Sequence, residues 1–362
     1  MLPSDLDRPD PLPVFVLGPA RGGTTLLVRL LDGHPLLAVL PTESQFYPVL
    51  TQRTLSRRVM QIADFLDWHS LPHVLGTRPF TLLTFQHRRG VAVWLKRWAE
   101  ELVPGEPGVP AVVEQSLSPL RGAETYWRAF LDVYQRLTHI ELAGKRYWVE
   151  KTPWNERFVP LIERFFGPDC RYLHIIRDPR AVIASTFPPG LETAARARLT
   201  VRRCFLWSRS VHRCRHHLGR LPGRYFALRY EDLVTRTKEI MRRVCQFLDI
   251  PAEESVFTAT RLGLPVSPNS AFPVTAPPGV VFSSQVHGYR GALSPAELDC
   301  IEQLLGPQMM ACGYSPRTFR VSSGRHALNA IPASARSHFK TALEALKVAR
   351  TQRQYAGVRL SF

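Results

Sequence analysis

A short apolar segment that runs into a glycine-rich loop is the feature that most constrains the fold of this chain. Residues 14–18 (VFVLG) predict a buried strand that ends at a glycine. The loop GPARGGTT at 18–25 follows, and residues 24–33 have helical spacing with a Gly-His-Pro stop. A strand, a glycine loop and a helix in this order place backbone N–H groups around an anion at the helix N-terminus.

The loop fits the phosphate-loop template GxxxxGK[ST] except at one position, because Thr24 stands where the template has lysine. Thr24 and Thr25 add hydroxyl donors, and Arg21 supplies a cation from inside the loop. ATP-dependent kinases use the lysine to hold the terminal phosphates. A loop without it suits a shorter anionic chain, although a glycine-rich turn that binds no ligand would have the same spacing.

The rest of the chain alternates strand and helix patterns. Strands are expected at 147–150, 172–176 and 225–229. Helices are expected at 55–68, 91–102, 124–142, 156–166, 181–186, 196–218, 232–248, 296–305 and 334–354. Ser294, Pro295 and Glu297 predict the cap of the helix at 296–305, and the Pro-rich stretch 262–283 is expected to be irregular loop. This order predicts an α/β fold of the P-loop-containing nucleoside triphosphate hydrolase type, with a mostly parallel central sheet flanked by helices and ligands at the carboxyl ends of its strands. We expect a single domain over 1–362, with a helical insertion at about 46–145 and a basic C-terminal extension at about 317–362.

Composition excludes several classes of protein. The chain has 362 residues, of which 45% are hydrophobic and 21% charged, so it is neither wholly disordered nor a disulfide miniprotein. The six cysteines are scattered without a CxxC pair, which indicates neither a zinc site nor a disulfide framework. No apolar run reaches the length of a membrane span, and the N-terminus lacks the features of a signal peptide, so a cytoplasmic location is expected.

The net charge of +17 admits two interpretations. Only six of the 47 basic residues are lysine, and this arginine excess is explained either by base composition or by an anionic partner. A nucleic-acid-binding protein is one such possibility, suggested by the basic helix expected at 196–218. No known nucleic-acid module is visible, and we therefore expect no nucleic-acid partner.

Five ordered segments resemble PAPS-dependent sulfotransferases, which use 3′-phosphoadenosine 5′-phosphosulfate (PAPS) as the sulfuryl donor. The segments are PARGGTTLL with LDGHP and TES, EKTP at 150–153, LHIIRDPRAVIAS at 173–185, RYEDL at 229–233 and SSQVHGYRGALSPAEL at 283–298. The pattern is most similar to bacterial and tyrosylprotein sulfotransferases. It departs from many relatives in having Gly22 in place of serine and Tyr289 in place of tryptophan.

The resemblance implies roles for individual residues. Glu43 would be the general base, Lys151 the cation on the sulfuryl and bridging oxygens, and Arg21 would share this work. The residues expected to bind PAPS are Arg21, Gly22, Gly23, Thr24, Thr25, Arg177, Ser185, Tyr230 and Arg290. In this assignment Arg177 and Ser185 bind the 3′-phosphate, Tyr230 approaches the adenine, and Arg290 reaches the phosphates from a closing loop.

Alternatives remain open at several of these positions. His34 is a rival base, although Gly-His-Pro is more typical of a helix terminator. Arg180 is expected to pair with Asp178 or with solvent rather than with a ligand. Phe187 or Trp154 could stack on the adenine in place of, or together with, Tyr230.

The function that this resemblance implies is sulfuryl transfer from PAPS to a hydroxyl group, by in-line attack with a glutamate base and no required metal. The acceptor is expected to be a small molecule or a natural product. The alternative is a P-loop nucleotide-dependent kinase or phosphotransferase, which the missing lysine disfavours. The oligomeric state is left open.

Overall fold

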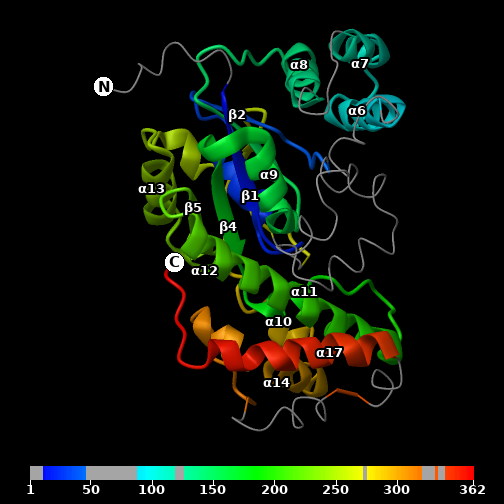
Figure 1. Ribbon diagram of the computed structural model, residues 1–362, viewed down its shortest axis with the longest axis vertical. Helices are drawn as coiled ribbons and strands as arrows, with labels where there is room; N and C mark the ends of the chain where they lie inside the picture. Colours follow the sequence, from blue (N-terminus) through cyan, green and yellow to red (C-terminus); the bar gives the residue numbers. More distant parts are fainter. Residues whose placement is uncertain (1–10, 46–87, 119–125, 272–274, 320–330, 333–338) are drawn as a thin grey trace.

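The computed structural model describes residues 11–45, 88–118, 126–271, 275–319, 331–332 and 339–362. Its centre is a five-stranded sheet in the order β2-β3-β1-β4-β5, in which every neighbouring pair is parallel (Figure 1). The strands are β1 (Leu12–Leu17), β2 (Leu37–Val39), β3 (Tyr147–Lys151), β4 (Arg171–Ile176) and β5 (Tyr225–Arg229). Together with the glycine loop after β1, this topology confirms the predicted P-loop-containing α/β fold.

Helices cover both faces of the sheet (Figure 1). They are α1 (Thr24–Leu31), α6 (Arg88–Leu102), α7 (Val109–Leu117), α8 (Tyr126–Thr138), α9 (Val159–Phe166), α10 (Pro179–Ala184), α11 (Thr193–Arg220), α12 (Tyr230–Thr235), α13 (Thr237–Leu248), α14 (Pro295–Ala311) and α17 (Phe339–Thr351). Short 3₁₀ turns are η5 (Asn155–Phe158), η6 (Gly167–Asp169), η7 (Glu254–Phe257), η8 (Gly288–Gly291) and η9 (Gln352–Tyr355).

The alternation of β1 explains how one strand supports two cores. Val14 and Val16 belong to the hydrophobic cluster that contains α1 and α13. Phe15 and Leu17 belong to the opposite cluster, which contains α8, α9 and α11. All four side chains are fully buried, as expected for a parallel strand covered on both faces.

Several local expectations need correction. The three-residue strand β2 was not predicted, because a run so short beside a helix stop carries no periodicity of its own. The helix expected at 232–248 is two helices, α12 and α13, separated at Arg236. The irregular loop expected at 262–283 begins with a small antiparallel ribbon, β6 (Thr260–Arg261) and β7 (Leu264–Pro265).

The insertion and the last helices follow the sequence more closely. Residues 88–145 include α6, α7 and α8, whereas the helix expected at 55–68 lies outside the described residues. The predicted cap of α14 is confirmed, since Ser294 and Glu297 form a reciprocal capping box. This helix runs beyond the expected end at residue 305, to Ala311, and contains Pro307.

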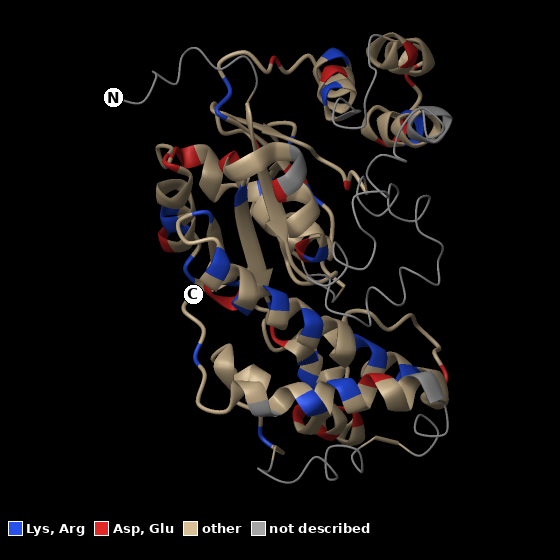
Figure 2. Ribbon diagram, viewed as in Figure 1, with Lys and Arg blue, Asp and Glu red and all other residues tan. Residues whose placement is uncertain are grey.

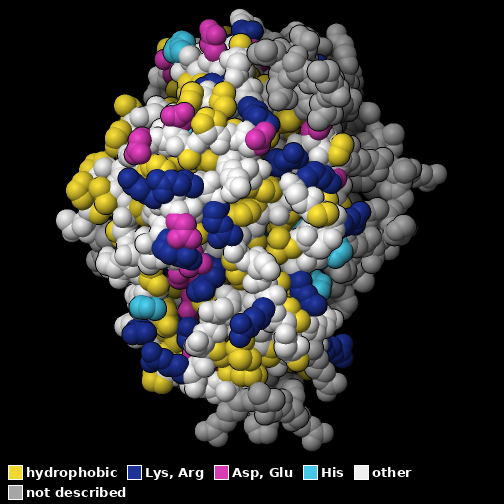
Figure 3. Space-filling model, turned by 90° about the vertical axis from the view of Figure 1, so that its left-hand side faces the viewer, with side chains coloured by type: hydrophobic (Ala, Val, Ile, Leu, Met, Phe, Trp, Pro, Cys, Tyr) yellow, Lys and Arg dark blue, Asp and Glu magenta, His cyan; other side chains and the backbone are white. Residues whose placement is uncertain are grey.

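Two arginines of α11 pair with acids of the helices that pack against it, and Figure 2 shows basic and acidic residues on these neighbouring helices. Arg196 bonds Glu297 of α14 at 2.8 Å, and Arg202 bonds Glu344 of α17. Glu344, the one acid of the basic C-terminal extension, is therefore paired with an arginine of the basic helix α11. On the face shown in Figure 3, basic side chains are interspersed with acidic and apolar ones.

None of the helices in the described ranges combines the length and the apolarity needed to cross a membrane.

Candidate active site

The glycine loop takes a conformation that its two positive-φ glycines permit. Gly18 has φ +139° and Gly23 has φ +102°. A Cβ atom at Gly18 would lie 2.5 Å from the carbonyl oxygen of Ile175, and one at Gly23 would lie 2.4 Å from the Tyr230 ring. The Gly22 N–H closes the turn by donating to the Pro19 carbonyl at 2.8 Å. The loop is thus packed between β4 and Tyr230 in a shape that only glycine allows at two points.

The loop ends at the N-terminus of α1 without a side-chain cap. Gly23 is the N-cap residue, and no side chain accepts a hydrogen bond from the first turn of the helix. The uncapped N–H groups and the positive end of the helix dipole favour an anion here. The hydroxyls of Thr24 and Thr25 stand at the same helix end.

A lysine and a glutamate meet beside this helix terminus. Lys151 ends β3, and its Nζ donates to Glu43 Oε1 at 2.7 Å and to Thr25 Oγ1 at 3.1 Å. The Lys151 side chain is 9% exposed, whereas the Glu43 side chain is 35% exposed and faces the opening. Glu43 Oε2 also accepts from Gln45 Nε2 at 3.0 Å. The two residues expected to be catalytic are therefore in direct contact at the carboxyl edge of the sheet.

A buried carboxylate anchors the segment that carries Glu43. Glu150 is fully buried, and its Oε1 accepts from Ser44 Oγ and Thr152 Oγ1, each at 2.6 Å. Its Oε2 accepts from Asn155 Nδ2 at 3.0 Å. Burial raises the pKa of Glu150, and the donated hydrogen bonds oppose that rise. Ser44 is thereby tied to β3, so Glu43 is held beside Lys151.

Glu150 was not among the residues expected from the sequence to have a role of their own. One signal could have revealed it, since an acidic residue in the otherwise apolar strand YWVEK must find donors when the strand is buried on both faces.

Ser44→Ala tests this anchor. Removing the hydroxyl takes one donor from a buried carboxylate, and a hydrogen bond to a charged group contributes about 1.5–3 kcal/mol. We therefore expect the free energy of unfolding in urea to fall by about that amount. The exposed Ser283 provides the control substitution Ser283→Ala, which should leave the urea midpoint unchanged. Equal midpoints for Ser44→Ala and the unmodified protein would contradict the anchoring role.

Two arginines at the loop, Arg21 within it and Arg177 after β4, have no acidic partner among the described residues. Arg177 follows β4, and its Nη1 donates to the backbone oxygen of Arg21 at 3.1 Å. Its guanidinium lies over the Tyr230 ring, 4.3 Å from the centroid. Burial lowers the pKa of Arg21, and the charge of Arg177 lowers it further. Neither arginine forms an ion pair with an acid in the part of the chain that the structure describes, which leaves two close positive charges available to an anion.

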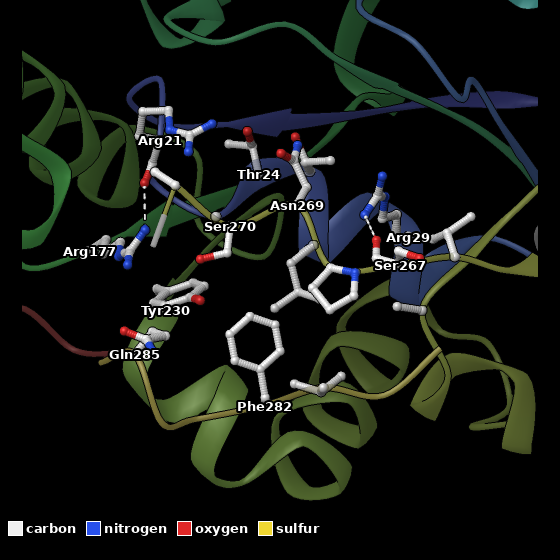
Figure 4. Close-up of a pocket in the computed structure, with 18 of the residues that line it drawn as sticks. Arg21, Thr24, Arg29, Arg177, Tyr230, Ser267, Asn269, Ser270, Phe282 and Gln285 are labelled. Atoms are coloured by element: carbon white, nitrogen blue, oxygen red, sulfur yellow. Dashed lines mark hydrogen bonds between the residues drawn. The ribbon is translucent and has the colours of Figure 1, made fainter. Parts of the chain in front are cut away.

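The glycine loop, the start of α1, Arg177 and Tyr230 line one cavity of about 210 Å³ (Figure 4). Arg21 and Thr24 border it on one side, and Tyr230 and Phe282 on the other. Its remaining walls come from the N-terminal half of α1 and from the segments 266–271 and 280–282. The cavity therefore combines a cationic end at the loop with an aromatic wall.

Several residues that line this cavity were not predicted from the sequence. Arg29, Asn269, Ser270, Phe282 and Gln285 all border the cavity, yet four of them lie in or next to the Pro-rich stretch that was expected to be irregular loop. Such a loop carries no periodicity that would show which of its side chains turn inward. Two positions offered a hint, since Gln285 lies inside the motif SSQVHGYR and Phe282 directly precedes it.

Three residues expected to bind the cofactor, Gly22, Ser185 and Arg290, do not line this cavity. Ser185 Oγ donates to the carbonyl of Val182, three residues earlier, at 2.8 Å. Arg290 is exposed on η8. From the motif SSQVHGYR, it is Gln285 that borders the cavity.

The alternative residues have structural partners. His34 is buried, with Nδ1 accepting from the Leu36 N–H at 3.1 Å and Nε2 therefore donating to the Pro251 carbonyl at 2.9 Å. Phe187 lies under the guanidinium of Arg196, 4.0 Å from its ring centroid. Trp154 borders a separate, arginine-rich cavity next to α11. These contacts assign each of the three a role outside the cavity described above.

Arg180 behaves as predicted. Its guanidinium bonds Asp178 Oδ2 and Glu302 Oε1, each at 2.6 Å. Arg180 therefore joins α10 to α14, and its positive charge is compensated by these two carboxylates.

The described residues contain no group of three or more His, Cys, Asp or Glu side chains that could hold a metal ion.

Comparison with known proteins places this site in a family. Residues 13–254 match the sequence model of the sulfotransferase family. The chain belongs to the sulfotransferase family. The matched region includes the glycine loop, Glu43, Lys151, Arg177 and Tyr230.

The relatives with a sulfotransferase description are distant. A putative protein-tyrosine sulfotransferase of Caenorhabditis briggsae is 27% identical over 239 residues, which cover 66% of this chain and 65% of that protein. A Caenorhabditis elegans protein of the same description is 26% identical over 123 residues, covering 33% of this chain and 45% of that protein. The chain thus spans less than two thirds of either sulfotransferase-like relative.

Among solved structures, the sulfotransferase domain of the Synechococcus PCC 7002 olefin synthase is 22% identical, with a TM-score of 0.48. The match covers 80% of this chain and 91% of that one. The sulfotransferase domain from the curacin biosynthetic pathway is 18% identical, with a TM-score of 0.47 and coverage of 82% and 98%.

Proposed function

We propose that this member of the sulfotransferase family transfers the sulfuryl group of PAPS to a hydroxyl group of a small molecule. One observation carries the proposal. The Lys151–Glu43 contact stands at the edge of an uncapped helix terminus and a glycine loop, so a cation and a base face the same anion site. Family membership supports the reaction class. Arg21 and Arg177, which form no ion pair with an acid among the described residues, support an anionic donor.

The cavity suits the two ends of such a donor. The glycine loop and the first turn of α1 would hold the 5′-phosphosulfate, because their N–H groups converge on one anion. Arg177 would bind the 3′-phosphate, and the wall formed by Tyr230 and Phe282 would contact the adenine. PAPS, when bound there, supplies an activated sulfuryl group joined to phosphate through an S–O bond.

In this proposal Glu43 takes the proton of the acceptor hydroxyl while the acceptor oxygen forms its bond to sulfur. The S–O bond to the 5′-phosphate breaks, and its electron pair leaves on the phosphate oxygen. Lys151 stabilises the negative charge on the sulfuryl and bridging oxygens, and its contact with Thr25 holds it beside the loop. Glu43 is free to accept a proton once Lys151 turns from its carboxylate to those oxygens.

Arg177→Ala tests the donor site through binding. Losing a charged hydrogen-bond donor to phosphate should weaken the affinity for 3′-phosphoadenosine 5′-phosphate (PAP), the desulfo product, by about 10- to 100-fold. Isothermal titration calorimetry without magnesium measures this, and Arg220→Ala at the exposed end of α11 is the matched control. An unchanged PAP affinity would remove Arg177 from the 3′-phosphate site.

The same titration separates the two reaction classes considered from the sequence. A sulfotransferase binds PAP without magnesium, whereas a P-loop kinase binds ATP with it. Incubation with ³⁵S-labelled PAPS and an acceptor panel, followed by mass identification of the product, then tests the transfer itself. Binding of ATP–Mg²⁺ but not of PAP would overturn the proposal.

A further inference from the structure

A second cavity, of about 310 Å³, adjoins the first beside the catalytic pair. We name it the side cavity. The residues that line it include Thr25, Arg29, Thr42, Glu43, Lys151 and Arg261. Thr25, Arg29 and Glu43 border both cavities, so a molecule in the side cavity would reach Glu43 without occupying the loop.

Two arginines in the side cavity have no acidic partner among the described residues. Arg29 donates from Nη1 to the Ser267 carbonyl at 2.9 Å, and Arg261 donates from Nη2 to the Glu101 carbonyl at 3.5 Å. Both side chains border the side cavity. Burial lowers the pKa of Arg29, and the charge of Arg261 lowers it further. Like charges at short range are unfavourable unless an anion joins them.

Two further polar atoms of the side cavity are buried and have no hydrogen-bond partner in the described structure. They are Arg261 Nε and Thr42 Oγ1. Buried polar atoms in native proteins nearly always find a partner, so an unsatisfied donor and hydroxyl in one cavity point to a ligand that completes them.

The acids in the side cavity are already engaged. Asp32 Oδ2 accepts from Thr260 Oγ1 at 2.6 Å and from the Gly263 N–H at 2.8 Å, and so fixes the β6–β7 ribbon to α1. Glu43 is bound by Lys151. Neither acid forms an ion pair with Arg29 or Arg261, so neither guanidinium is bound to a carboxylate in the described structure.

We propose that the side cavity binds a carboxylate of the acceptor through Arg261 and Arg29, so that the preferred acceptor is a small hydroxy acid whose hydroxyl lies at Glu43. This rests on the proposed function. Guanidinium groups match a carboxylate with paired N–H donors, and the two cations would share it. The volume lies at the lower end of small-molecule sites, which suits a compact acid rather than a folded protein.

The test measures binding of matched acids and esters to the enzyme saturated with PAP. The probes are 4-hydroxybenzoate, 4-hydroxyphenylacetate and 3-hydroxybutanoate, each paired with its methyl ester. At least one acid should bind about tenfold more tightly than its ester, as a charge-assisted pair implies. Arg261→Gln should abolish that preference, Arg261→Lys should retain part of it, and the exposed control Arg220→Gln should leave it unchanged.

PAP affinity separates this inference from the proposal on which it rests. Arg261 borders the side cavity and does not border the cavity proposed to hold the donor. Because ions in solution screen a charge that does not contact the ligand, PAP should bind Arg261→Gln with an affinity within about twofold of that of the unmodified protein. A large loss of PAP affinity would assign the arginine to the donor and overturn the inference. It is equally overturned if no acid binds better than its ester, or if Arg261→Gln weakens both alike. Failure of the unmodified protein to bind PAP would instead refute the proposed function.

Discussion

Glu43→Gln is expected to lower kcat for sulfuryl transfer by about 10²- to 10⁴-fold, the contribution of a general base, while PAP affinity stays unchanged. Glutamine keeps the shape of the side chain and can still accept from Lys151, but it cannot take the acceptor proton at neutral pH. The measurement is the rate of product formation from ³⁵S-labelled PAPS, together with calorimetric titration of PAP.

The control for this substitution is Glu141→Gln, which removes one negative charge from an exposed site in the segment after α8. It should leave kcat unchanged. Activity of Glu43→Gln equal to that of the control would exclude Glu43 as the base. His34 could not then take its place, because both of its ring nitrogens are bound to backbone groups in the core.

Lys151→Met is expected to lower kcat by about 10²- to 10³-fold, the usual effect of removing one group that stabilises transition-state charge. Methionine replaces the buried stem of the lysine, and the partly exposed Glu43 remains solvated, so the fold should persist. PAP affinity should fall much less than kcat, because the charge that Lys151 meets develops during transfer.

The matched control is Lys96→Met, at a half-exposed position of α6, and equal melting temperatures would show that both variants are folded. A kcat for Lys151→Met that equals that of Lys96→Met would remove Lys151 from the reaction. A fall in PAP affinity as large as the fall in kcat would instead assign Lys151 to donor binding. Measuring kcat and PAP affinity together therefore shows whether Lys151 acts in the transfer step or in donor binding.

Much of the fold could be predicted because its signals are local. The buried strands β1, β3, β4 and β5 are short apolar runs bounded by turn residues, and α14 begins at a readable capping box. The glycine loop follows from one spacing, since Gly18 and Gly23 take positive φ values that other residues avoid. Strand β2 and the break at Arg236 escaped prediction because neither extends over enough residues to show a period.

The candidate site was predictable only in part. Motifs that end or follow a strand, such as those carrying Lys151 and Arg177, must gather at the carboxyl edge of a parallel sheet. Ser185 and Arg290 stand in equally clear motifs, yet one bonds within its own helix and the other is exposed. A motif identifies the segment, whereas the direction of each side chain depends on what packs against it.

By itself, the sequence determined the phosphate-loop architecture, which depends on backbone torsions and on strand ends, and its ordered motifs indicated the family. The assignment of Glu43 and Lys151 as the catalytic pair is a prediction that the resemblance implies. Only the tertiary structure decided which of the many arginines are paired with an acid and which are not. The charge of Arg180 is compensated by Asp178 and by Glu302, which is 122 residues away, whereas Arg177 and Arg261 meet no acid in the described structure. Ion pairing depends on neighbours brought together by folding, and no count of charges along the chain contains that information.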